Sequence, residues 1–511
     1  MFIPSVLIII AIIVPIIIFP KSSATFVNAA FAFATNQFGW LYLLAGFSVV
    51  VFLIGLACSR YGSVRLGGPD DKPEFSYFSW VAMIFAGGIG IAIVNWAWVE
   101  PIYHLKSPPF GVKPFSQAAA EWALADCQFN WGLTPWALYC LPAIPIAYSM
   151  YVHNRPGVRL SVASRGVLGR HADGWIGVLL DAVVVFGIIG GVGTSLGLAI
   201  PLVSQLTSGL LGIEPSFMVD MGVLLVWTAM FTVSVWFGLA KGIKVLSDIN
   251  VILAAAMLLF TFVVGHSVFI MNAWIDSLGQ MVANFVRLST WTDPFGGSSF
   301  YQNWTVFYWA WWIAYAPMMG LFVARISRGR TIRELIIAEL VFGSLGCWGF
   351  FAAWGGYAMQ LQTNGILDVA SILTNGGIPA AVGAILNTLP FAPLITALFI
   401  LLCFIFLATT LDSSAYVLAS VTSTKLSGYE EPKRQLRLIW AFLIALVGVA
   451  LVKLGGLKQV QTSTIVVALP MIPVLLIMTL SLIRWLKRDF PKKAAKAHLV
   501  LEDQQRASAK P

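Results

Sequence analysis

Aromatic residues are densest between Trp304 and Tyr315, where four tryptophans and three other aromatic residues occupy twelve positions of a hydrophobic segment. If this segment is helical, Trp311, Trp312 and Tyr315 lie on one side, because residues three and four apart are neighbours. Aromatic ring faces attract the diffuse positive charge of a quaternary ammonium group. The cluster therefore predicts an aromatic cage for such a cation. The alternatives are an aromatic belt at a membrane surface and ordinary helix packing.

A second aromatic group, Trp131, Trp136 and Tyr139, lies at the beginning of another apolar stretch. Trp136 and Tyr139 are about one helical turn apart. Two such groups on distant helices would enclose one ligand if they faced each other. Each ring contributes about 0.5–2 kcal/mol to the binding of a desolvated cation. Three or four rings therefore account for micromolar affinity after the ordering costs of binding are deducted.

Hydroxyl and carboxyl groups interrupt a third apolar stretch at Thr409, Thr410 and Asp412. Polar groups this far into an apolar run are costly unless they have partners, so a functional role is the default expectation. Threonine hydroxyls together with free backbone carbonyls offer the hard oxygen ligands that suit sodium. The alternative is that each hydroxyl bonds to a carbonyl of its own helix.

These residues belong to a chain of 511 residues that is 59% hydrophobic and only 10% charged, with a mean hydropathy of +0.85. Soluble domains carry far more charge, so the composition predicts an all-α polytopic membrane protein. A window of about 19 residues predicts twelve transmembrane helices. Their ranges are 2–20, 40–58, 78–99, 132–151, 175–204, 217–239, 245–270, 305–324, 334–358, 392–421, 436–452 and 462–486. The first range has no preceding positive charge, which favours a retained helix over a cleaved signal peptide.

Two of these spans contain clusters of residues that weaken helices, Ala86–Ala92 in the third and Ala316–Gly320 in the eighth. Broken helices at corresponding positions of two halves mark the binding site of many transporters. The alternative is that the small residues let neighbouring helices pack closely.

Basic residues are concentrated in alternate connections and at the C-terminal end, which together hold 25 of the 31 lysines and arginines. This bias predicts that both termini are cytoplasmic in a multi-pass protein of the plasma (inner) membrane. The net charge of +9 is therefore interpreted as a topology signal, and no nucleic-acid partner is expected.

Segments outside the spans are few. Residues 271–304 carry apolar side chains at helical spacing, which predicts an amphipathic helix lying on the outer surface. Residues 487–511 form a charged cytoplasmic tail.

The sequence does not indicate an enzyme. The five cysteines and five histidines show no metal-ligand or redox spacing, and Asp412 beside its hydroxyls is a poor basis for catalysis. No cofactor is expected, apart from sodium as a coupling ion. A passive channel would take up its solute without saturation, and a closed aromatic cage argues against it.

Considered together, the motifs resemble the betaine/carnitine/choline transporter (BCCT) family over residues from about 70 to 465. The motifs are Glu100–His104, Trp131–Tyr139, Gly193–Leu198, Trp304–Trp312 and Ala324–Glu334. The resemblance implies import of a quaternary-ammonium zwitterion of the glycine betaine or carnitine type, by alternating access and usually in a homotrimer with lipid around it. It also implies the sodium-coupled amino-acid-transporter fold, with two inverted five-helix repeats. The divisions would be residues 1–77 (two helices), 78–270 (first repeat), 271–304 (surface helix), 305–486 (second repeat) and 487–511 (tail).

Carried over position by position, the resemblance assigns a substrate cage to Trp131, Trp136, Tyr139, Trp311, Trp312 and Tyr315, with Tyr103 as a further aromatic of carnitine-type members. The family's glycine-rich stretch would line the same site through Gly88, Gly90 and Ala92, the last replacing a glycine. Choline-specialised members place an acidic residue in this stretch, and this chain has none there, which favours a zwitterion. Asn95 is expected to contact a substrate oxygen.

The coupling ion is expected at a site that the resemblance assigns to the carbonyls of Ala86, Ile89 and Phe406 and the hydroxyls of Thr409 and Thr410. Exchangers of the family carry an arginine that replaces one sodium ion, at the position where this chain has Asn250. Because that arginine is missing here, the resemblance implies an intact sodium site. Met319 aligns with a methionine that replaces a second ion in those exchangers. One sodium is therefore expected, and the alternative is a sodium-independent exchanger of carnitine and butyrobetaine type.

Overall fold

The computed structural model describes residues 6, 18–68, 70–155, 159–237, 244–423, 426, 430–454, 465–466 and 468–491. Within these residues the regular elements are helices, and the β pairing present is a single isolated bridge between Arg65 and Thr331. The expectation of an all-helical chain is confirmed for this part of the protein. The first predicted span, 2–20, lies almost wholly outside the described residues.

The first half of the described chain contains eleven α-helices and three short 3-10 or π-helical segments. The α-helices are α2 (Pro20–Cys58), α3 (Tyr77–Gly88), α4 (Gly90–Trp96), α5 (Glu100–Lys106), α6 (Gln117–Asn130), α7 (Leu133–Ala147), α8 (Leu160–Ala163), α9 (Arg165–Leu168), α10 (Trp175–Leu211), α11 (Phe217–Phe237) and α12 (Lys244–Val264). The short segments are η1 (Arg60–Ser63), η2 (Tyr148–Val152) and η3 (Gly169–Asp173).

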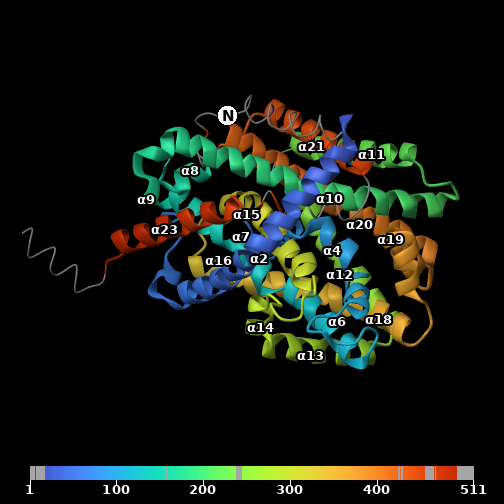
Figure 1. Cartoon of the computed structure of the whole chain (residues 1–511). Helices are drawn as coiled ribbons and strands as arrows, with labels where there is room; N and C mark the ends of the chain where they lie inside the picture. The colour runs from blue at the N-terminus through green and yellow to red at the C-terminus, as the bar shows by residue number, and fades with distance from the viewer. Residues whose placement is uncertain are drawn as a thin grey trace, which may run out of the picture.

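The second half begins on the outer rim, where α13 (Ser267–Ala283) and α14 (Phe285–Thr290) lie along one edge of the molecule (Figure 1). The sequence analysis expected one amphipathic helix at 271–304, and the structure has these two helices over residues 267–290. The remaining elements are η5 (Gln302–Val306), α15 (Phe307–Ile326), α16 (Ile332–Ile337), η6 (Ala338–Gly343), α17 (Ser344–Phe350), η7 (Phe351–Gly355), α18 (Gly356–Thr363), α19 (Val369–Asn387), α20 (Ala392–Thr422), α21 (Arg434–Leu454) and α23 (Met471–Asp489).

Among the described residues, seven helices are long and apolar enough to cross a membrane, and the bent pair α3 and α4 makes an eighth. The seven are Asn28–Cys58, Trp175–Leu211, Val245–Val264, Gln302–Ile326, Ile332–Thr363, Val369–Asn387 and Ala392–Thr422. The predicted spans at 132–151, 217–239, 436–452 and 462–486 overlap α7, α11, α21 and α23, which are not among the seven. These findings support a polytopic membrane protein.

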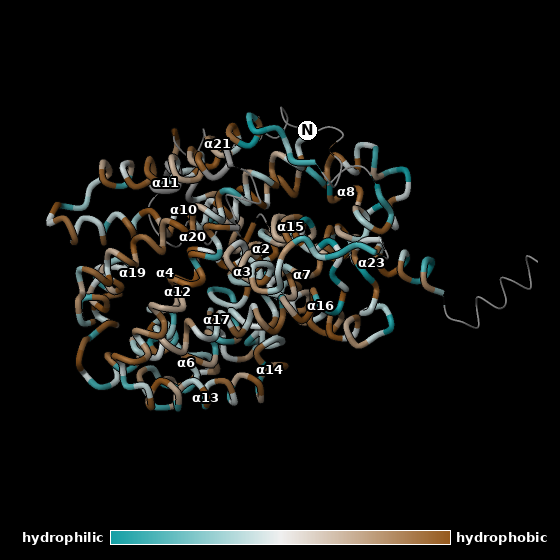
Figure 2. The backbone as a smooth tube through the Cα atoms, turned by 180° about the vertical axis from the view of Figure 1, so that it is seen from behind, coloured by the Kyte–Doolittle hydropathy of each residue, from teal (hydrophilic) through white to brown (hydrophobic). Residues whose placement is uncertain are grey.

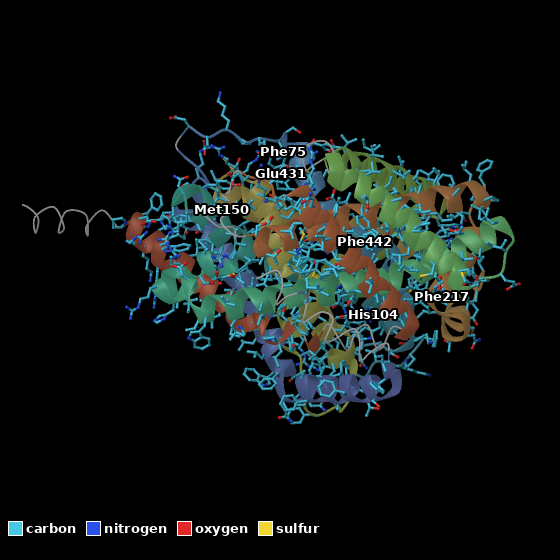
Figure 3. The ribbon with its side chains drawn as sticks, turned by 90° about the horizontal axis from the view of Figure 1, so that it is seen from above. Phe75, His104, Met150, Phe217, Glu431 and Phe442 are labelled. Atoms are coloured by element: carbon cyan, nitrogen blue, oxygen red, sulfur yellow. The ribbon has the colours of Figure 1, made fainter. Side chains whose placement is uncertain are left out.

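Burial separates a central helix from the helices around it. The apolar window of α15 is 100% buried, whereas that of α12 is 28% buried. Large apolar side chains project from the outer helices, and Phe442 on α21, labelled in Figure 3, is 66% exposed. Apolar faces of this extent are unusual on soluble proteins and suit contact with lipid. Hydrophilic stretches lie mainly in the connections, for example around α8 and beside α23 (Figure 2).

Two features of the helices differ from the sequence expectation. The predicted interruption at Ala316–Gly320 is absent, because α15 continues through Pro317 and the irregular geometry lies earlier, in the π-helical turn η5. A proline inside a helix is tolerated where close packing on all sides holds the segment together. In addition, α19 was not predicted as a span, because it contains a polar and glycine-rich stretch and is kinked at Gly377, where φ is 73°.

The end of α23, which the sequence predicts to be cytoplasmic, contacts the end of α7 through Asp489. This residue lies three positions beyond the end of the predicted span at 486. His153 Nε2 lies 2.7 Å from an Asp489 carboxylate oxygen, and the Tyr148 hydroxyl donates to the same oxygen over 2.8 Å. Partial burial raises the pKa of Asp489, but hydrogen bonds from Arg488, His153 and Tyr148 outweigh it and lower the pKa to about 2.

Candidate functional site

Five rings of the predicted cage form one contiguous cluster between α7 and α15, which pack along each other in the middle of the fold (Figure 1). Trp311 and Trp312 stack with ring centroids 5.3 Å apart and an interplanar angle of 2°. Trp131 meets Trp312 edge-on at 5.0 Å, and Tyr139 meets it edge-on at 5.9 Å. Trp136 in turn lies 6.0 Å from Tyr139. The two aromatic groups seen in the sequence therefore face each other, and all five rings are buried.

The polar edges of three rings are tied to groups outside the cluster. The Trp312 indole N–H donates to the Asn130 carbonyl over 3.2 Å, and the Tyr139 hydroxyl donates to the Gly88 carbonyl over 3.1 Å. The Trp131 indole N–H donates to Glu100 over 2.7 Å. Because the edges are held in this way, what the rings offer to a ligand are their faces, which are the part that attracts a cation.

Tyr315, the sixth residue of the predicted cage, is turned toward α10. Its hydroxyl lies 2.7 Å from the Ser195 hydroxyl, and its ring packs against Gly191, where an added Cβ would collide with it. The pairing with Ser195 was not predicted, although Ser195 lies in the motif Gly193–Leu198. The Tyr315 hydroxyl thus has a specific partner on the neighbouring helix.

The predicted interruption of the third span is present and lies beside the aromatic cluster. α3 ends at Gly88 and α4 begins at Gly90, with an angle of 66° between them, and Gly90 has φ +50°, which favours glycine. A Cβ at Gly88 would lie 3.1 Å from the Met319 methyl and 3.3 Å from the Trp136 ring. The break therefore adjoins both the cage and the methionine assigned to coupling.

The hydroxyls of the predicted sodium site lie on α20, which contacts this break. Thr409 and Thr410 on α20 both donate to the Phe406 carbonyl, over 2.8 and 3.1 Å, which is the back-bonded arrangement considered as the alternative. A Cβ at Gly90 would collide with the Thr410 hydroxyl, so α20 touches the break directly. Ala86 and Ile89 are buried on the α3 side. Hydroxyl and carbonyl oxygens beside a helix break are the kind of ligands that bind sodium.

The remaining predicted site residues lie at different distances from the cluster. Ala92 and Asn95 are buried on α4, and the Asn95 amide N–H donates to the Ile91 carbonyl over 3.2 Å, whereas its Oδ1 has no hydrogen-bond partner among the described residues. Tyr103 contacts Trp96 and Trp304 with centroids 6.1 and 5.5 Å apart. Tyr103 thus belongs to a second aromatic layer outside the cage.

Asn250 and Asp412 are both buried, but they differ in whether their side chains have a polar partner in the described part of the chain. Asn250 is fully buried on α12, and both polar atoms of its side chain lack hydrogen-bond partners in the described part of the chain. Asp412 is fully buried too, but it lies 3.1 Å from the guanidinium of Arg437, which is also buried. The ion pair accounts for the deep carboxylate structurally and joins α20 to α21.

A buried polar hub behind the cage was missed by the sequence reasoning. Its centre is Glu100, whose Oε2 accepts hydrogen bonds from the Trp131 indole N–H at 2.7 Å and the Tyr308 hydroxyl at 2.6 Å. Its Oε1 accepts one from Asn130 at 3.2 Å and lies 3.3 Å from His104 Nε2. A carboxylate inside the apolar part of the chain was the available signal, since such groups are rarely without a role.

The same hub places Glu100, His104 and Cys127 close together, with one potential metal-ligand atom of each within 4.8 Å of the others. His104, labelled in Figure 3, also has its Nδ1 3.5 Å from Asp126 Oδ2. Hydrogen bonds already occupy both Glu100 oxygens, so the cluster is explained as the anchor of the Trp131 and Tyr308 rings.

The sequence of the chain is similar to that of known transporters. A sequence model of the betaine/carnitine/choline family transporters (BCCT) matches residues 1–491 of the chain. The chain is also 38% identical over 477 residues to the glycine betaine transporter OpuD of Bacillus subtilis (strain 168), an alignment that covers 93% of this chain and 91% of that protein.

Proposed function

Because this chain belongs to the betaine/carnitine/choline transporter family, we propose that it imports a quaternary-ammonium zwitterion of the glycine betaine or carnitine type, coupled to sodium. The protein is a transporter and not an enzyme, and it is a multi-pass membrane protein. The proposal adds the cargo, the coupling ion and the mechanism of alternating access. It also includes twelve helices with two inverted five-helix repeats, cytoplasmic termini and a homotrimer.

The observation that carries the proposal is the contiguous cluster of Trp131, Trp136, Tyr139, Trp311 and Trp312. Five buried rings in contact, three of which have their polar edges engaged elsewhere, are more than packing of two helices requires. They offer π faces to a cation that cannot donate a hydrogen bond, which describes a trimethylammonium group. A zwitterion also needs a donor for its carboxylate, and the Asn95 amide nitrogen on the adjoining α4 has a second N–H besides the one it donates to the Ile91 carbonyl.

The rings contact one another directly, so the ligand enters only when they separate. We assign this arrangement to a closed state of the transport cycle. α7 and α15 each carry part of the cage, and a small relative movement of the two helices would open it toward one side of the membrane at a time.

Sodium coupling is supported by the approach of Thr410 to the helix break at Gly90. In the arrangement described here both threonine hydroxyls donate to the Phe406 carbonyl. A sodium ion would draw both threonine hydroxyls away from that carbonyl and use the oxygens as ligands. One sodium moving inward with a neutral zwitterion transfers one net charge. The membrane potential then contributes about 2.3 kcal/mol per 100 mV to accumulation.

The second candidate is an exchanger of related zwitterions that does not use sodium. The position of Met319 beside Gly88 favours the exchanger, because a thioether next to the helix break would take the place of a sodium ion. The absence of a positive side chain at Asn250 favours the symporter. Exchange would be insensitive to the membrane potential, and symport would not.

The test is uptake into proteoliposomes of glycine betaine, carnitine and γ-butyrobetaine, with sodium and the membrane potential varied independently. We expect saturable, sodium-dependent uptake that increases with an inside-negative potential. Thr409→Ala should lose sodium dependence. Thr261→Ala, which removes an equally buried, back-bonded hydroxyl on α12, should keep it. Equal uptake without sodium in the wild type would contradict the symport proposal.

A further inference from the structure

Glu339 is a fully buried carboxylate in η6, within the long helix Ile332–Thr363. Neither of its oxygens has a hydrogen-bond partner among the described residues, and none of the ion pairs found there includes it. A charged carboxylate without partners is expensive in a low-dielectric interior. Glu339 therefore needs a proton or a bound cation to remain where it is.

Glu339 faces the interior of the helix bundle. On the same helix, Ile337, Val341 and Phe342 are exposed, which defines the outward face, whereas Glu339 lies on the side that packs against α7 and α3. One turn further on, a Cβ at Gly343 would collide with the Trp136 ring. The carboxylate is thus about one helical turn from a wall of the aromatic cage.

The titratable groups around Glu339 do not pair with it. Tyr139 and Cys140 face it from α7 within electrostatic range, and the Tyr139 hydroxyl is already committed to the Gly88 carbonyl. On the preceding turns, Arg333 extends outward to the Ala57 carbonyl, and Glu334 is engaged in a capping box with Thr331.

The two other elements packed against η6 contribute no nearby charge. α3 carries Tyr77 at its exposed end, where the ring contacts Phe342, and α17 carries Cys347. The titratable groups that face Glu339 in the described chain are therefore uncharged tyrosine and cysteine side chains.

These surroundings distinguish a proton from a metal ion. Sodium and similar cations require several oxygen ligands arranged around them. A proton requires only the carboxylate. The local backbone adds an independent indication, because η6 is a π-helical segment, and such interruptions of α-helices occur frequently at functional sites.

We propose that Glu339 is a proton-binding site whose occupancy is linked to transport. This inference rests on the proposed function. In the closed state the carboxyl group carries a proton and is neutral. When the cage opens toward the extracellular side the carboxylate takes up one proton, and when it opens toward the cytoplasm the same proton leaves. Each cycle then moves one proton inward in addition to the sodium ion and the zwitterion.

The test uses full-length protein in proteoliposomes that contain a trapped pH-sensitive dye, with the membrane potential clamped. Adding glycine betaine outside should acidify the lumen of wild-type vesicles. Glu339→Gln, which has the same shape and cannot release a proton, should bind or take up glycine betaine without acidification. The matched control Glu121→Gln alters an exposed carboxylate on α6 and should behave as the wild type.

The pH dependence of affinity provides a second readout that does not require transport. Linkage of one proton to substrate binding makes the apparent Kd of the wild type rise about tenfold per pH unit once Glu339 is ionised in the free protein. Tryptophan fluorescence in detergent would measure it, and Glu339→Gln should show no such rise. An infrared carbonyl band of a protonated carboxyl group should be present in the wild type and absent in the variant.

The outcomes separate the two proposals. Uptake of glycine betaine by the wild type without lumenal acidification would overturn the proton site and leave the transport function standing. Unchanged acidification in Glu339→Gln would overturn it as well, and so would loss of sodium dependence in that variant without any change in proton movement. No uptake or binding of any quaternary-ammonium zwitterion by the wild type would contradict the proposed function itself.

Discussion

Replacing Trp312 tests the aromatic cage most sharply, because this ring contacts three other rings of the cage. It stacks on Trp311 and meets Trp131 and Tyr139 edge-on. Removing one ring from around a desolvated cation costs about 1–2 kcal/mol of binding free energy. Since 1.4 kcal/mol corresponds to a factor of ten, Trp312→Leu should raise the KM for glycine betaine about 5- to 30-fold. Trp312→Phe keeps a smaller π face and should lie between the wild type and the leucine variant.

The matched control is Trp227→Leu. Trp227 is fully buried on α11, and its indole N–H donates to the Phe404 carbonyl over 3.0 Å, much as that of Trp312 donates to Asn130. Both substitutions remove a buried indole with one hydrogen bond, so both should lower thermal stability similarly. KM from proteoliposome uptake should change in the Trp312 series alone. If Trp227→Leu raised KM as much as Trp312→Leu, the effect would be one of folding, and the cage interpretation would be refuted.

Three further predictions concern neighbouring parts of the structure. Gly90→Ala should reduce sodium-dependent uptake about tenfold or more, because the left-handed backbone disfavours alanine by about 1–2 kcal/mol and the new methyl group collides with Thr410. Unaltered sodium activation of uptake in this variant would contradict an ion site at the helix break. Ser195→Ala and Tyr315→Phe should each raise KM about 2- to 10-fold, since each removes the same buried hydrogen bond between hydroxyls, worth about 0.5–1.5 kcal/mol. The double variant should have a KM no higher than that of either single variant. Additive effects on KM would show that the two hydroxyls act independently. Asp489→Asn should lower the Tm of the detergent-solubilised protein by about 1–2 °C near neutral pH. The depressed pKa of about 2 means that this contribution is present above the ordinary carboxyl pKa and is lost as the pH falls toward 2, so the two proteins should converge in acid, and a constant difference down to pH 2 would contradict the assigned hydrogen bonds.

Helical spacing was sufficient to predict that Trp311, Trp312 and Tyr315 lie on one side of a helix, because residues three and four apart are neighbours. The helix break near Gly88 was also predicted, since closely spaced glycines weaken a helix locally. That the two aromatic groups meet is a property of how α7 packs against α15, which residue spacing does not specify. The orientation of Tyr315 toward α10 likewise depends on a partner 120 residues away.

The errors have physical causes too. Pro317 was expected to break α15, but a helix buried on every side retains its path through a proline. α19 was missed because glycines and a proline around its kink at Gly377 lower the local hydropathy. Glu339 and Glu100 were predictable from the sequence. Each is a carboxylate in or beside an apolar span, and the rule that singled out Asp412 applies equally to both.

The hub at Glu100 suggests why the cage keeps its shape. One carboxylate accepts hydrogen bonds from Trp131 and Tyr308, which come from different parts of the chain and flank Trp312. A buried network with most of its groups satisfied restricts the rings to a single arrangement. Rings that are already oriented lose little entropy on binding, which increases the affinity obtained from each.

The central claim is that ring faces recognise positive charge, and the most direct measurement compares glycine betaine with its carbon isostere 3,3-dimethylbutanoate. The two compounds share shape and carboxylate, and they differ in whether the trimethyl group is charged. Competition for uptake in proteoliposomes should show the isostere binding at least tenfold more weakly than glycine betaine, with the gap narrowed in Trp312→Leu. Equal affinity of the wild type for both compounds would show that the rings provide an apolar surface alone, contrary to the cation cage.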